Sequence, residues 1–370
     1  MASPRHGGNV VWAAELAGCF PQDILDFSAS INPMGPPDSA IAAIEANLDQ
    51  LRVYPDPTYS RLRQALADFH HISPDWICPG NGAAELLTWS SRELAQTKTT
   101  YLPTPAFSDY WRSLKAFDAN ITPQPVLLGA TSDIQHYQVC VPESAPNCGI
   151  LINNPHNPTG ALFDYSDLCD CLDAFSLVVI DEAFIDFLPP GQQPTLLPLV
   201  GEYSNLVVLR SLTKFYSLPG LRIGYAVAHP DRLRRWQLWR DPWSVNALAA
   251  VATEAALQDR AFHERTWAWL PPARQQLLSG LRSLPGLRPY SSVANYILVQ
   301  YGGSAVRLQQ QLLQRHRILI RDCVSFPELG DGYFRVAVRT PAENQQLLEA
   351  LADSLDAEFD TELDAEAAAG

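Results

Sequence analysis

Lys214 is the residue whose surroundings most clearly suggest chemistry. It lies in the segment Ser211–Arg222, between hydroxyl-bearing residues and a Pro-Gly turn, directly after an apolar run at 205–210. Hydroxyl groups and the guanidinium of Arg222 can bind a phosphate group from several sides. A lysine in a loop is otherwise only solvated, so this segment predicts an anion site next to an amine.

An acidic residue, Asp181, ends a second apolar run at 178–180. Parallel sheets present their functional groups at the carboxyl ends of their strands. The acid either caps a helix or, if it is buried, keeps a pyridine nitrogen protonated so that the ring becomes an electron sink. The second interpretation requires a cofactor.

Two turns carry further candidate ligands. The segment Asn153–Gly160 contains prolines that fix its polar side chains, and Asn157 among them can donate to a phenolate oxygen. The segment Pro79–Glu85 is rich in small residues and lies between a strand and a helix. Backbone amides at such a helix start bind phosphate, although the glycines alone would also make a tight turn.

The elements that must position these turns follow an alternating pattern. Helical spacing is present at 39–51 and 60–70, and short apolar strands are expected at 75–79, 149–153, 177–180, 205–210 and 223–228. Strands that alternate with helices imply a mainly parallel sheet with both faces covered. The sequence therefore predicts an α/β domain whose strand ends carry the candidate residues.

The segments before and after this predicted domain have different sequence patterns. Prolines break the segment 26–37, which is expected to be an extended arm, and a long helical stretch at 245–283 is expected to break or kink at Pro271-Pro272. Strands at 296–300, 318–321 and 334–338 then predict an α+β unit. The predicted organisation is an arm at 1–37, a large domain at 38–242, a small domain at 243–356 and a disordered acidic tail at 357–370.

Composition excludes several classes of partner. A chain of 370 residues that is 47% hydrophobic can bury a full core, and its net charge of −14 argues against nucleic acid and anionic membranes. No apolar run approaches the roughly 20 residues that span a bilayer, and no export signal is indicated, so a cytoplasmic location is expected. The lone close cysteine pair, Cys169 and Cys171, is poor evidence for zinc, and no metal is expected.

Taken together, these motifs resemble fold-type I enzymes that use pyridoxal 5′-phosphate (PLP), the aspartate aminotransferase-like superfamily. The likeness covers about Tyr54 to Arg339 and rests on the order Gly82-Ala83-Ala84, Asn157, Asp181, Lys214, Arg222. It implies an α/β large domain with a mainly parallel sheet and a smaller α+β domain. It also implies that Lys214 carries PLP as a Schiff base, that Asp181 pairs with the pyridinium nitrogen and that Asn157 bonds the ring oxygen.

The same resemblance implies further roles around the cofactor. Phe107 would stack on the ring, while Gly82, Ala83, Ser211 and Arg222 would surround the phosphate. Tyr54 matches the tyrosine that similar enzymes lend to the neighbouring subunit's phosphate, which implies a homodimer. Phe184 is a departure, because many similar aminotransferases have a tyrosine there that bonds the ring oxygen.

Two sister groups in this superfamily are the most similar. They are the histidinol-phosphate aminotransferases of histidine biosynthesis and the L-threonine-O-3-phosphate decarboxylases of cobalamin biosynthesis. The segments at 6–9, 26–37, 210–220 and 334–340, and the Phe184 variant, resemble the decarboxylases. The expected reaction is therefore decarboxylation of L-threonine O-3-phosphate to (R)-1-amino-2-propanol O-2-phosphate, with transamination of histidinol phosphate as the alternative.

Four residues are candidates for substrate binding. His6 and Asn32 are expected to reach over the site and help to hold a substrate phosphate, although His6 could equally belong to a flexible N-terminus. Arg321 and Arg335 lie at strand ends, where a planar guanidinium can take a phosphate or a carboxylate in two hydrogen bonds. An ion pair at the surface is the alternative for either arginine.

Overall fold

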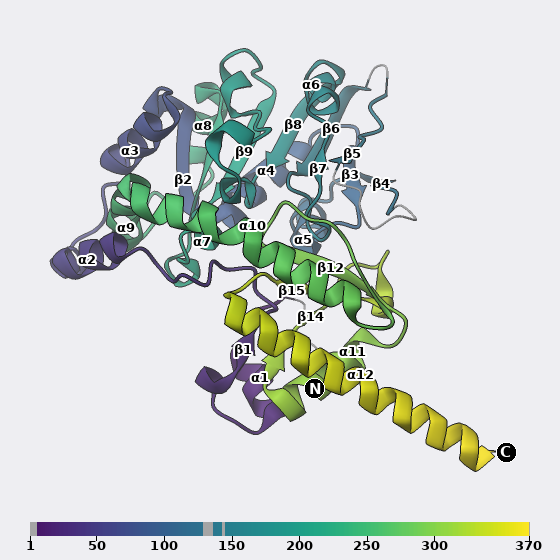
Figure 1. The fold of residues 1–370 in the computed structure, drawn as a ribbon. Helices are drawn as coiled ribbons and strands as arrows, with labels where there is room; N and C mark the ends of the chain where they lie inside the picture. Colours follow the sequence, from purple (N-terminus) through teal and green to yellow (C-terminus); the bar gives the residue numbers. More distant parts are fainter. Residues whose placement is uncertain (1–5, 129–135, 143–144, 370) are drawn as a thin grey trace.

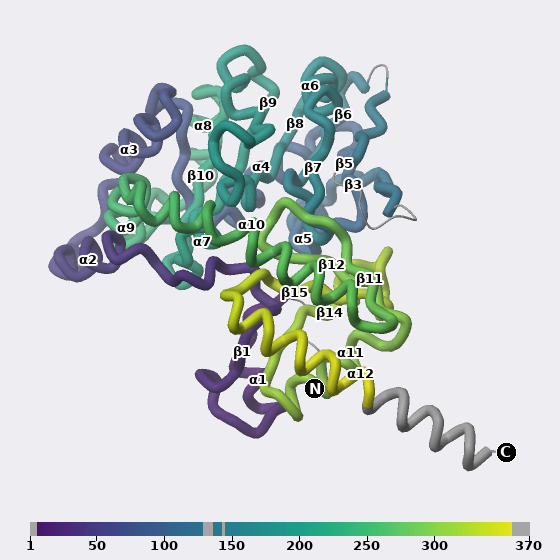
Figure 2. Tube along the Cα trace, viewed as in Figure 1, coloured from purple at the N-terminus to yellow at the C-terminus, as the bar shows by residue number. Residues whose placement is uncertain are grey.

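The computed structural model describes residues 6–128, 136–142 and 145–369, with side chains described up to Asp356. Figure 1 shows an upper part built around a seven-stranded sheet and a lower part built around a four-stranded sheet, with the long helix α10 (Arg260–Ser283) running between them. Figure 2 traces the N-terminal arm from the lower part across to α2 (Asp38–Ala46).

The seven-stranded sheet is parallel except at one strand. Its order is β2-β10-β9-β8-β6-β3-β4, and β10 is antiparallel to both of its neighbours. These strands are β2 (Ile77–Asn81), β3 (Thr100–Thr104), β4 (Ile121–Pro125), β6 (Ala145–Asn153), β8 (Phe175–Asp181), β9 (Leu206–Ser211) and β10 (Ile223–Ala228). The prediction of a mainly parallel sheet is confirmed.

Helices cover both faces of this sheet. Alternate residues of β8 belong to different hydrophobic clusters, with Val178 and Ile180 on one face and Leu177 and Val179 on the other. Such two-sided burial explains why the central strands are continuous apolar runs rather than alternating ones. The helices of this part are α3 (Ser60–His70), α4 (Ala83–Leu94), α5 (Ser108–Lys115), α6 (Tyr165–Ala174), α7 (Leu212–Phe215) and α8 (Pro230–Gln237).

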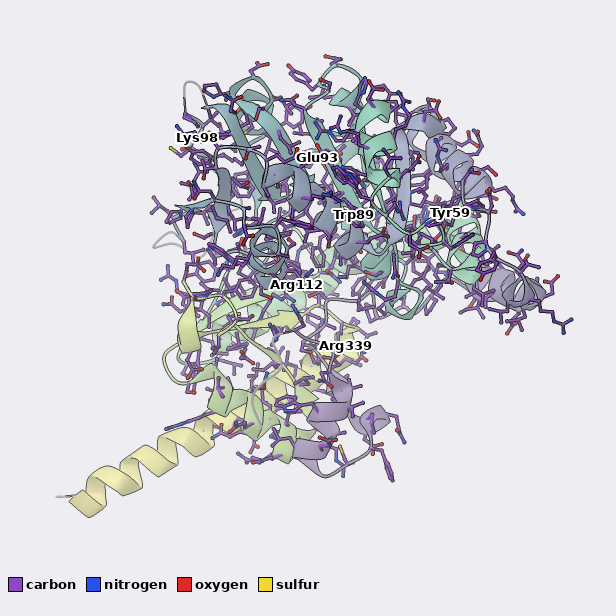
Figure 3. All side chains as sticks on the ribbon, turned by 180° about the vertical axis from the view of Figure 1, so that it is seen from behind. Tyr59, Trp89, Glu93, Lys98, Arg112 and Arg339 are labelled. Carbon is purple, nitrogen blue, oxygen red and sulfur yellow. The ribbon has the colours of Figure 1, made fainter. Side chains whose placement is uncertain are left out.

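Polar side chains fasten α8 to α4 on the side seen in Figure 3. Glu93, labelled there, accepts a hydrogen bond of 2.6 Å from the indole nitrogen of Trp236 and forms an ion pair with Arg232. One turn or more earlier on α4, Trp89 donates to Glu85 over 3.1 Å. The helix that begins at the candidate phosphate site is thus fixed along its length.

The four-stranded sheet is antiparallel and carries the arm at one side. Its strands, in the order β11-β12-β15-β14, are β11 (Leu287–Pro289), β12 (Tyr296–Tyr301), β15 (Tyr333–Ala337) and β14 (Arg321–Asp322). The arm contributes α1 (Val10–Ala17) and β1 (Leu25–Asp26), which pairs in parallel with β13 (Ile318–Leu319). The guanidinium of Arg339, labelled in Figure 3, donates to the carbonyl of Asp26 over 3.1 Å, which anchors the arm to the segment that follows β15.

The helical stretch after residue 242 breaks at a different place from the one predicted. It forms α9 (Ala247–Gln258) and α10, and both Pro271 and Pro272 lie inside α10. The break is at Asp259, whose side chain accepts a hydrogen bond of 2.9 Å from the amide of Phe262 and so begins a new helix. The prolines are tolerated because the buried face of α10 continues through them with Leu270, Ala273 and Leu277.

The domain boundary predicted at 242/243 is not marked by a change of packing partner. The helix α9 packs against α2 and α3, beside the large sheet, whereas α10 contacts both the segment Ile185–Phe187 and the strand β11. The chain thus crosses between the two parts along α10. The remaining elements are α11 (Ala305–His316), α12 (Pro341–Ala369), β5 (His136–Tyr137) and β7 (Leu162–Phe163).

Three predictions concern the rest of the chain. The acidic tail at 357–370 lies outside the described side chains, so its disorder stays a prediction. Within the described ranges, none of the helices is both long enough and apolar enough to cross a membrane. In the same residues, no three histidine, cysteine or acidic side chains gather in a way that would hold a metal ion.

Candidate active site

A cavity of about 560 Å³ opens where β6, β8 and β9 end and faces the strands β14 and β15. Seven predicted cofactor residues line it: Ala83, Phe107, Asn157, Asp181, Ser211, Lys214 and Arg222. Three predicted substrate residues, His6, Arg321 and Arg335, line the same cavity from the arm and the small sheet. The structure thus brings together residues from both parts and from the arm.

Asp181 is a buried carboxylate with two fixed oxygens. The strand β8 delivers it to the cavity with 8% of its surface exposed. The phenol of Tyr110 donates to Oδ2 over 2.7 Å, and the amide of Ala183 donates to Oδ1 over 3.0 Å. Burial raises the pKa of Asp181, while these hydrogen bonds and the nearby Lys214 oppose the rise by favouring the anion.

Lys214 lies across the cavity floor on the short helix α7. Its Nζ donates to the hydroxyl of Thr213 over 2.8 Å. Burial and the positive charges of Arg222 and Arg335 lower the pKa of Lys214 to about 8, although the negative charge of Asp181 acts in the opposite direction. A lysine with such a pKa is partly neutral, and therefore nucleophilic, near physiological pH.

The turn at Gly82 and the Arg222 side chain form an anion cradle. Gly82 has φ of +74°, which strains any other residue, and a Cβ there would lie 2.5 Å from Nη2 of Arg222, so another side chain would displace the guanidinium from its present position. Ala83 begins α4, whose free N-terminal amides attract anions. The hydroxyls of Ser211 and Thr213, which also line the cavity, are 2.8 Å apart.

Asn157 joins the cofactor side of the cavity to the substrate side. The backbone amide of Asn157 donates to Oδ1 of Asn153 over 2.8 Å, which fixes the turn. Its Oδ1 accepts a hydrogen bond from Nη1 of Arg335. Because Oδ1 is engaged in this way, Nδ2 is the group left to donate into the cavity.

Arg321 and Arg335 form a paired cationic wall. They lie opposite each other in the register of β14 and β15, with 5% and 9% of their surfaces exposed. Arg321 donates to the hydroxyl of Ser325 over 2.7 Å. Burial lowers the pKa of both guanidinium groups, the mark of cations held in a site with little water.

His6 and Phe107 meet above the cavity. The two rings have centroids 5.7 Å apart in an edge-to-face arrangement, and Nε2 of His6 lies 3.9 Å from a carboxylate oxygen of Asp109. The arm reaches this position because the amide of Gly8 donates to the hydroxyl of Ser28 over 2.8 Å. His6 therefore lines the cavity, and its ring contacts the residue predicted to stack on the cofactor, while its role in holding a substrate phosphate stays a prediction.

Asn32 does not line the cavity, which corrects the prediction for this residue. Its Nδ2 donates to the carbonyl of Phe215 and to the hydroxyl of Thr266, both over 2.9 Å, and its Oδ1 accepts from the amide of Met34. These bonds tie the arm to α7 and α10. They also use the side chain fully, so it has a structural role.

Ser30 takes the place on the cavity wall that was predicted for Asn32. The amide of Ile31 bonds to the carbonyl of Ala29 over 2.9 Å, a tight turn that breaks the alternation of an extended arm. Ser30 is 3% exposed, and its hydroxyl has no hydrogen-bond partner within the described part of the chain. The sequence offered no sign of this turn.

Tyr54 is not part of this cavity. It is 78% exposed and its ring lies 4.7 Å from that of Trp243. Leu51 and Val53 beside it are each 67% exposed. A role for Tyr54 in its own subunit's cavity is therefore excluded by its position, and the predicted role in a neighbouring subunit stays a prediction.

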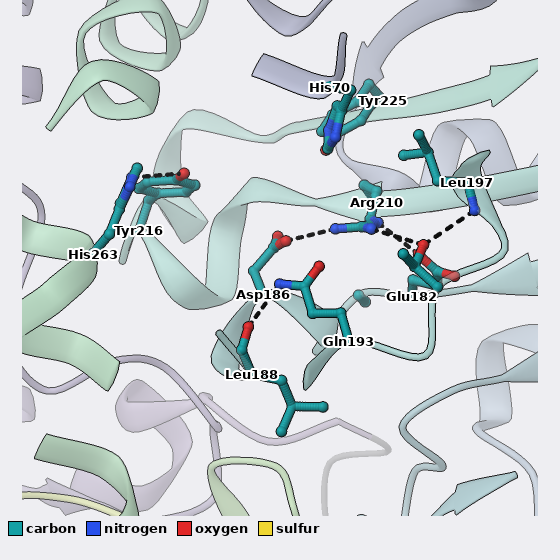
Figure 4. A network of polar contacts seen from close by, with 12 residues as sticks. His70, Glu182, Asp186, Leu188, Gln193, Leu197, Arg210, Tyr216, Tyr225 and His263 are labelled. Carbon is teal, nitrogen blue, oxygen red and sulfur yellow. Dashed lines mark hydrogen bonds and ion pairs between the residues drawn. The ribbon is translucent and has the colours of Figure 1, made fainter. Parts of the chain in front are cut away.

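A buried ionic network, shown in Figure 4, lies behind the site. Arg210 donates from Nε to Glu182 over 2.8 Å and from Nη1 to Asp186 over 2.6 Å. Arg210 precedes Ser211 at the end of β9, and Glu182 follows Asp181 at the end of β8. The network therefore fixes the ends of the two strands that carry candidate catalytic groups.

The cavity fits PLP in three independent respects. The turn at Gly82 and Ala83 forms, with Arg222, an anion cradle that a Cβ at position 82 would enter. Asp181 is a buried acid that can face a pyridine nitrogen, and Lys214 is a half-buried amine that lines the cavity. Phe184 is buried and lies against Tyr296 with ring centroids 4.9 Å apart. The ring oxygen would thus depend on Asn157 without help from a phenol at position 184.

Comparisons with known proteins agree with this geometry. The chain is 39% identical to the threonine-phosphate decarboxylase of Salmonella typhimurium over 366 residues, or 96% of this chain and 98% of that protein. It is 31% identical to a histidinol-phosphate aminotransferase of Methanothermobacter thermautotrophicus, over 94% of this chain and 93% of the other. The structure of L-threonine-O-3-phosphate decarboxylase from Porphyromonas gingivalis has a TM-score of 0.78 at 26% identity, covering 89% of this chain and 99% of that one.

These similarities extend over both sheets and the arm, so they concern the whole fold rather than one motif. They confirm the predicted α/β fold with an aspartate aminotransferase-like large domain. A model of the family described as aminotransferase class I and II matches residues 22–351, and the chain therefore belongs to that family.

Proposed function

We propose that this chain is a PLP-dependent decarboxylase that converts L-threonine O-3-phosphate to (R)-1-amino-2-propanol O-2-phosphate in cobalamin biosynthesis. The observation that carries the choice of reaction is the 39% identity with the Salmonella decarboxylase along 98% of its length. The identity with the histidinol-phosphate aminotransferase is lower, at 31%. The paired arginines beside Lys214 support a substrate that carries two anionic groups as well as an amine.

The proposed cofactor contacts follow from the geometry of the cavity. Lys214 would bind PLP covalently, Asp181 would hold the proton on the pyridine nitrogen, and Asn157 would donate from Nδ2 to the ring oxygen. Phe107 would stack on the ring. The phosphate is bound by Arg222, Ser211 and the amides that follow Gly82, where the helix α4 begins.

The proposed substrate contacts come from the opposite wall. Arg321 and Arg335 bind the phosphate and the carboxylate, because each presents a planar fork that suits such groups. His6 and Ser30 close the site from the arm, and the unpartnered hydroxyl of Ser30 is supplied with a partner when the substrate is present. Burial of Arg321, Arg335 and Ser30 strengthens their interactions with an anion.

The reaction depends on how the substrate is oriented. When bound, PLP supplies a ring that accepts the electron pair of whichever bond to the substrate Cα stands perpendicular to it. One of the two arginines, Arg321 or Arg335, would hold the carboxylate in that position so that carbon dioxide leaves, while the other binds the phosphate. Asp181, held by Tyr110, keeps the ring nitrogen protonated, and Lys214 returns a proton to Cα.

We also propose a homodimer in which Tyr54 reaches the phosphate site of the neighbouring subunit. Exposed apolar residues surround Tyr54, and such a patch suits contact with a second copy of the chain. The cytoplasmic location predicted from the sequence belongs to the same proposal.

Histidinol-phosphate aminotransferase is the second candidate, because both substrates combine a phosphate with an amine. The deciding experiment incubates the PLP-loaded protein with L-threonine O-3-phosphate, without any keto acid, and follows carbon dioxide and the amine product. Steady release of both supports the decarboxylase. Absence of release, together with formation of glutamate from histidinol phosphate and 2-oxoglutarate, would assign the aminotransferase activity instead.

A further inference from the structure

Tyr296 is a buried aromatic residue between the two parts of the molecule. It begins β12 and has no exposed surface. Its phenol donates to the carbonyl of His156 over 2.9 Å, and its ring meets the ring of Phe184 at 76° with centroids 4.9 Å apart. Contacts at its tip and at its side therefore fix the plane of this ring.

The face of the Tyr296 ring supports Arg335. In the ladder between β12 and β15, Tyr296 pairs with Ala337 and Leu298 pairs with Arg335, so Tyr296 and Arg335 are diagonal neighbours on one face of the sheet. The guanidinium carbon of Arg335 lies 4.7 Å from the ring centroid. This distance lies within the range in which a cation is attracted to the electron-rich face of an aromatic ring.

The hydrogen-bond partner of this guanidinium is also neutral, and its neighbour across the ladder, Arg321, is another cation rather than a counter-ion. Nη1 of Arg335 donates to Asn157, and no carboxylate among residues 6–128, 136–142 and 145–356 forms an ion pair with Arg335. A carboxylate partner would orient the arginine but would also cancel its charge and compete with an anionic ligand. An aromatic ring and an amide oxygen orient it and leave the charge available.

We propose that Tyr296 is a positioning residue that holds Arg335 against the cavity for the anionic group of the substrate. The inference rests on the proposed function and deepens it, because it explains how a buried cation is kept ready without a counter-ion. Phe184 contacts the ring from the cofactor side, so the contacts from Phe184 through Tyr296 to Arg335 link the cofactor wall to the substrate wall.

The test compares two substitutions in the PLP-loaded protein. Tyr296→Phe keeps the ring and removes the bond to His156, whereas Tyr296→Leu removes the ring. Tyr296→Leu should raise KM for L-threonine O-3-phosphate about 5- to 30-fold with little change in kcat, and Tyr296→Phe should change KM less than about 3-fold. Tyr301→Leu, in the same strand but away from the cavity, is the matched control for loss of a tyrosine ring.

A binding measurement separates this inference from the proposed reaction. The dissociation constant of inorganic phosphate, measured by calorimetry on the PLP-loaded proteins, should rise in Tyr296→Leu by a similar factor, whichever substrate the wild type turns over. Failure of the wild type to release carbon dioxide would remove the proposed function but not this ratio. Binding of PLP itself should stay within about 2-fold, which a general loss of folding would not allow.

Two results would overturn the role of Tyr296. One is a Tyr296→Leu protein that retains wild-type KM and phosphate affinity. The other is a Tyr296→Phe protein as impaired as Tyr296→Leu, since that would assign the effect to the bond with His156. If Tyr296→Leu does not fold, Tyr296→Met, which is flexible and of similar length, provides the ring-free variant on which the same comparison decides.

Discussion

At the scale of single residues, burial moves two key groups towards their neutral forms. Burial raises the pKa of the Asp181 carboxyl and lowers that of the Lys214 amine to about 8. The two side chains then restrain each other, because each favours the charged form of the other. The hydrogen bonds from Tyr110 and Ala183 add to this restraint at Asp181. The site thus keeps the Asp181 carboxylate and the reactive Lys214 amine close together in surroundings that exclude much of the solvent.

Covalent attachment of PLP can be located directly. Borohydride reduction of the PLP-loaded protein, followed by peptide mass spectrometry, should find the cofactor on Lys214. The other lysines of the chain, Lys98 and Lys115, are exposed and serve as internal controls. The variant Lys98→Ala/Lys115→Ala should keep the visible band of bound PLP, and Lys214→Ala should lose it and nearly all turnover. Label on either surface lysine instead would contradict the assignment.

The shifted pKa of Lys214 has two consequences for pH dependence. Only the neutral amine attacks PLP, so the rate of reconstitution of the apoprotein should rise about tenfold per pH unit well below pH 8 and level off above it. The unfolded chain, with a lysine pKa near 10.5, binds more protons between pH 8 and 10.5 than the folded one. Lys214 therefore makes stability rise with pH in this window, and Lys214→Met should lack that rise in urea titrations.

Tyr110→Phe isolates the hydrogen bond to Asp181. A hydrogen bond to a charged group is worth about 1.5–3 kcal/mol, so its loss should raise the pKa of Asp181 further and weaken its hold on the ring nitrogen. The ring then withdraws less charge from the linkage to Lys214, and the visible band of bound PLP should titrate at higher pH, with kcat reduced about tenfold. Tyr101→Phe, in β3, is the control. An unchanged titration would show that Tyr110 only packs.

The residues of the site differ in how well sequence could find them. Lys214, Asp181, Asn157 and Arg222 follow strands directly, so their positions could be inferred from the order of elements. Ser30 could not be told from Asn32, because a single turn decides which of them faces the cavity. Tyr110 was missed because its contact with Asp181 joins residues far apart in the chain, on α5 and β8.

At the scale of elements, the ends of β8 and β9 are locked together by Arg210. Arg210 is 1% exposed, and its guanidinium bonds to both Glu182 and Asp186. Arg210→Met should cost about 3–5 kcal/mol in unfolding free energy of the apoprotein, because it leaves two buried carboxylates without a cation. The change can be measured as the shift of the urea midpoint. Arg61→Ala, which breaks the exposed pair with Glu254, should cost less than about 1 kcal/mol.

A urea midpoint equally affected by both substitutions would contradict the structural role of the Arg210 network. Loss of PLP affinity in Arg210→Met is expected as well, since the network positions the strand ends that carry Asp181 and Ser211. The conservative change Arg210→Lys should restore part of the stability, because a lysine keeps the charge but not the two-sided geometry.

The helices show why local patterns predict elements better than their ends. The helix at 60–70 has the predicted bounds, because its apolar spacing agrees with its packing. The helix does not break at Pro271-Pro272, because tertiary contacts of α10 outweigh two missing backbone donors, and the alternative of a kink there stays a prediction. The actual break at Asp259 depends on one capping side chain, a signal that resembles many others in the sequence.

At the scale of the whole molecule, the cavity is assembled from segments that are far apart in sequence. The arm supplies His6 and Ser30, the large sheet supplies Asp181 and Lys214, and the small sheet supplies Arg335. The arm is held on both sides, by pairing of β1 with β13 and by the bonds of Asn32 to α7 and α10. The sequence predicted an extended arm but not the surface on which it lies, because the partners are contributed by distant elements.

The proposed dimer can be tested by mixing two inactive variants. If Tyr54 acts in the neighbouring subunit, a heterodimer of Lys214→Ala and Tyr54→Ala subunits contains one native site, formed by the intact lysine of one subunit and the intact tyrosine of the other. Random reassociation makes half of the dimers mixed, so about one quarter of the wild-type activity should return.

If Tyr54 served its own subunit, no native site would form in any mixture and activity would not return. The exposed position of Tyr54, outside the cavity of its own chain, favours recovery. The mixture is prepared by joint denaturation and refolding with PLP, and each variant refolded alone is the control. Recovery that depends on joint refolding, and not on simple mixing of the folded proteins, would place the active site at an interface between two copies of the chain.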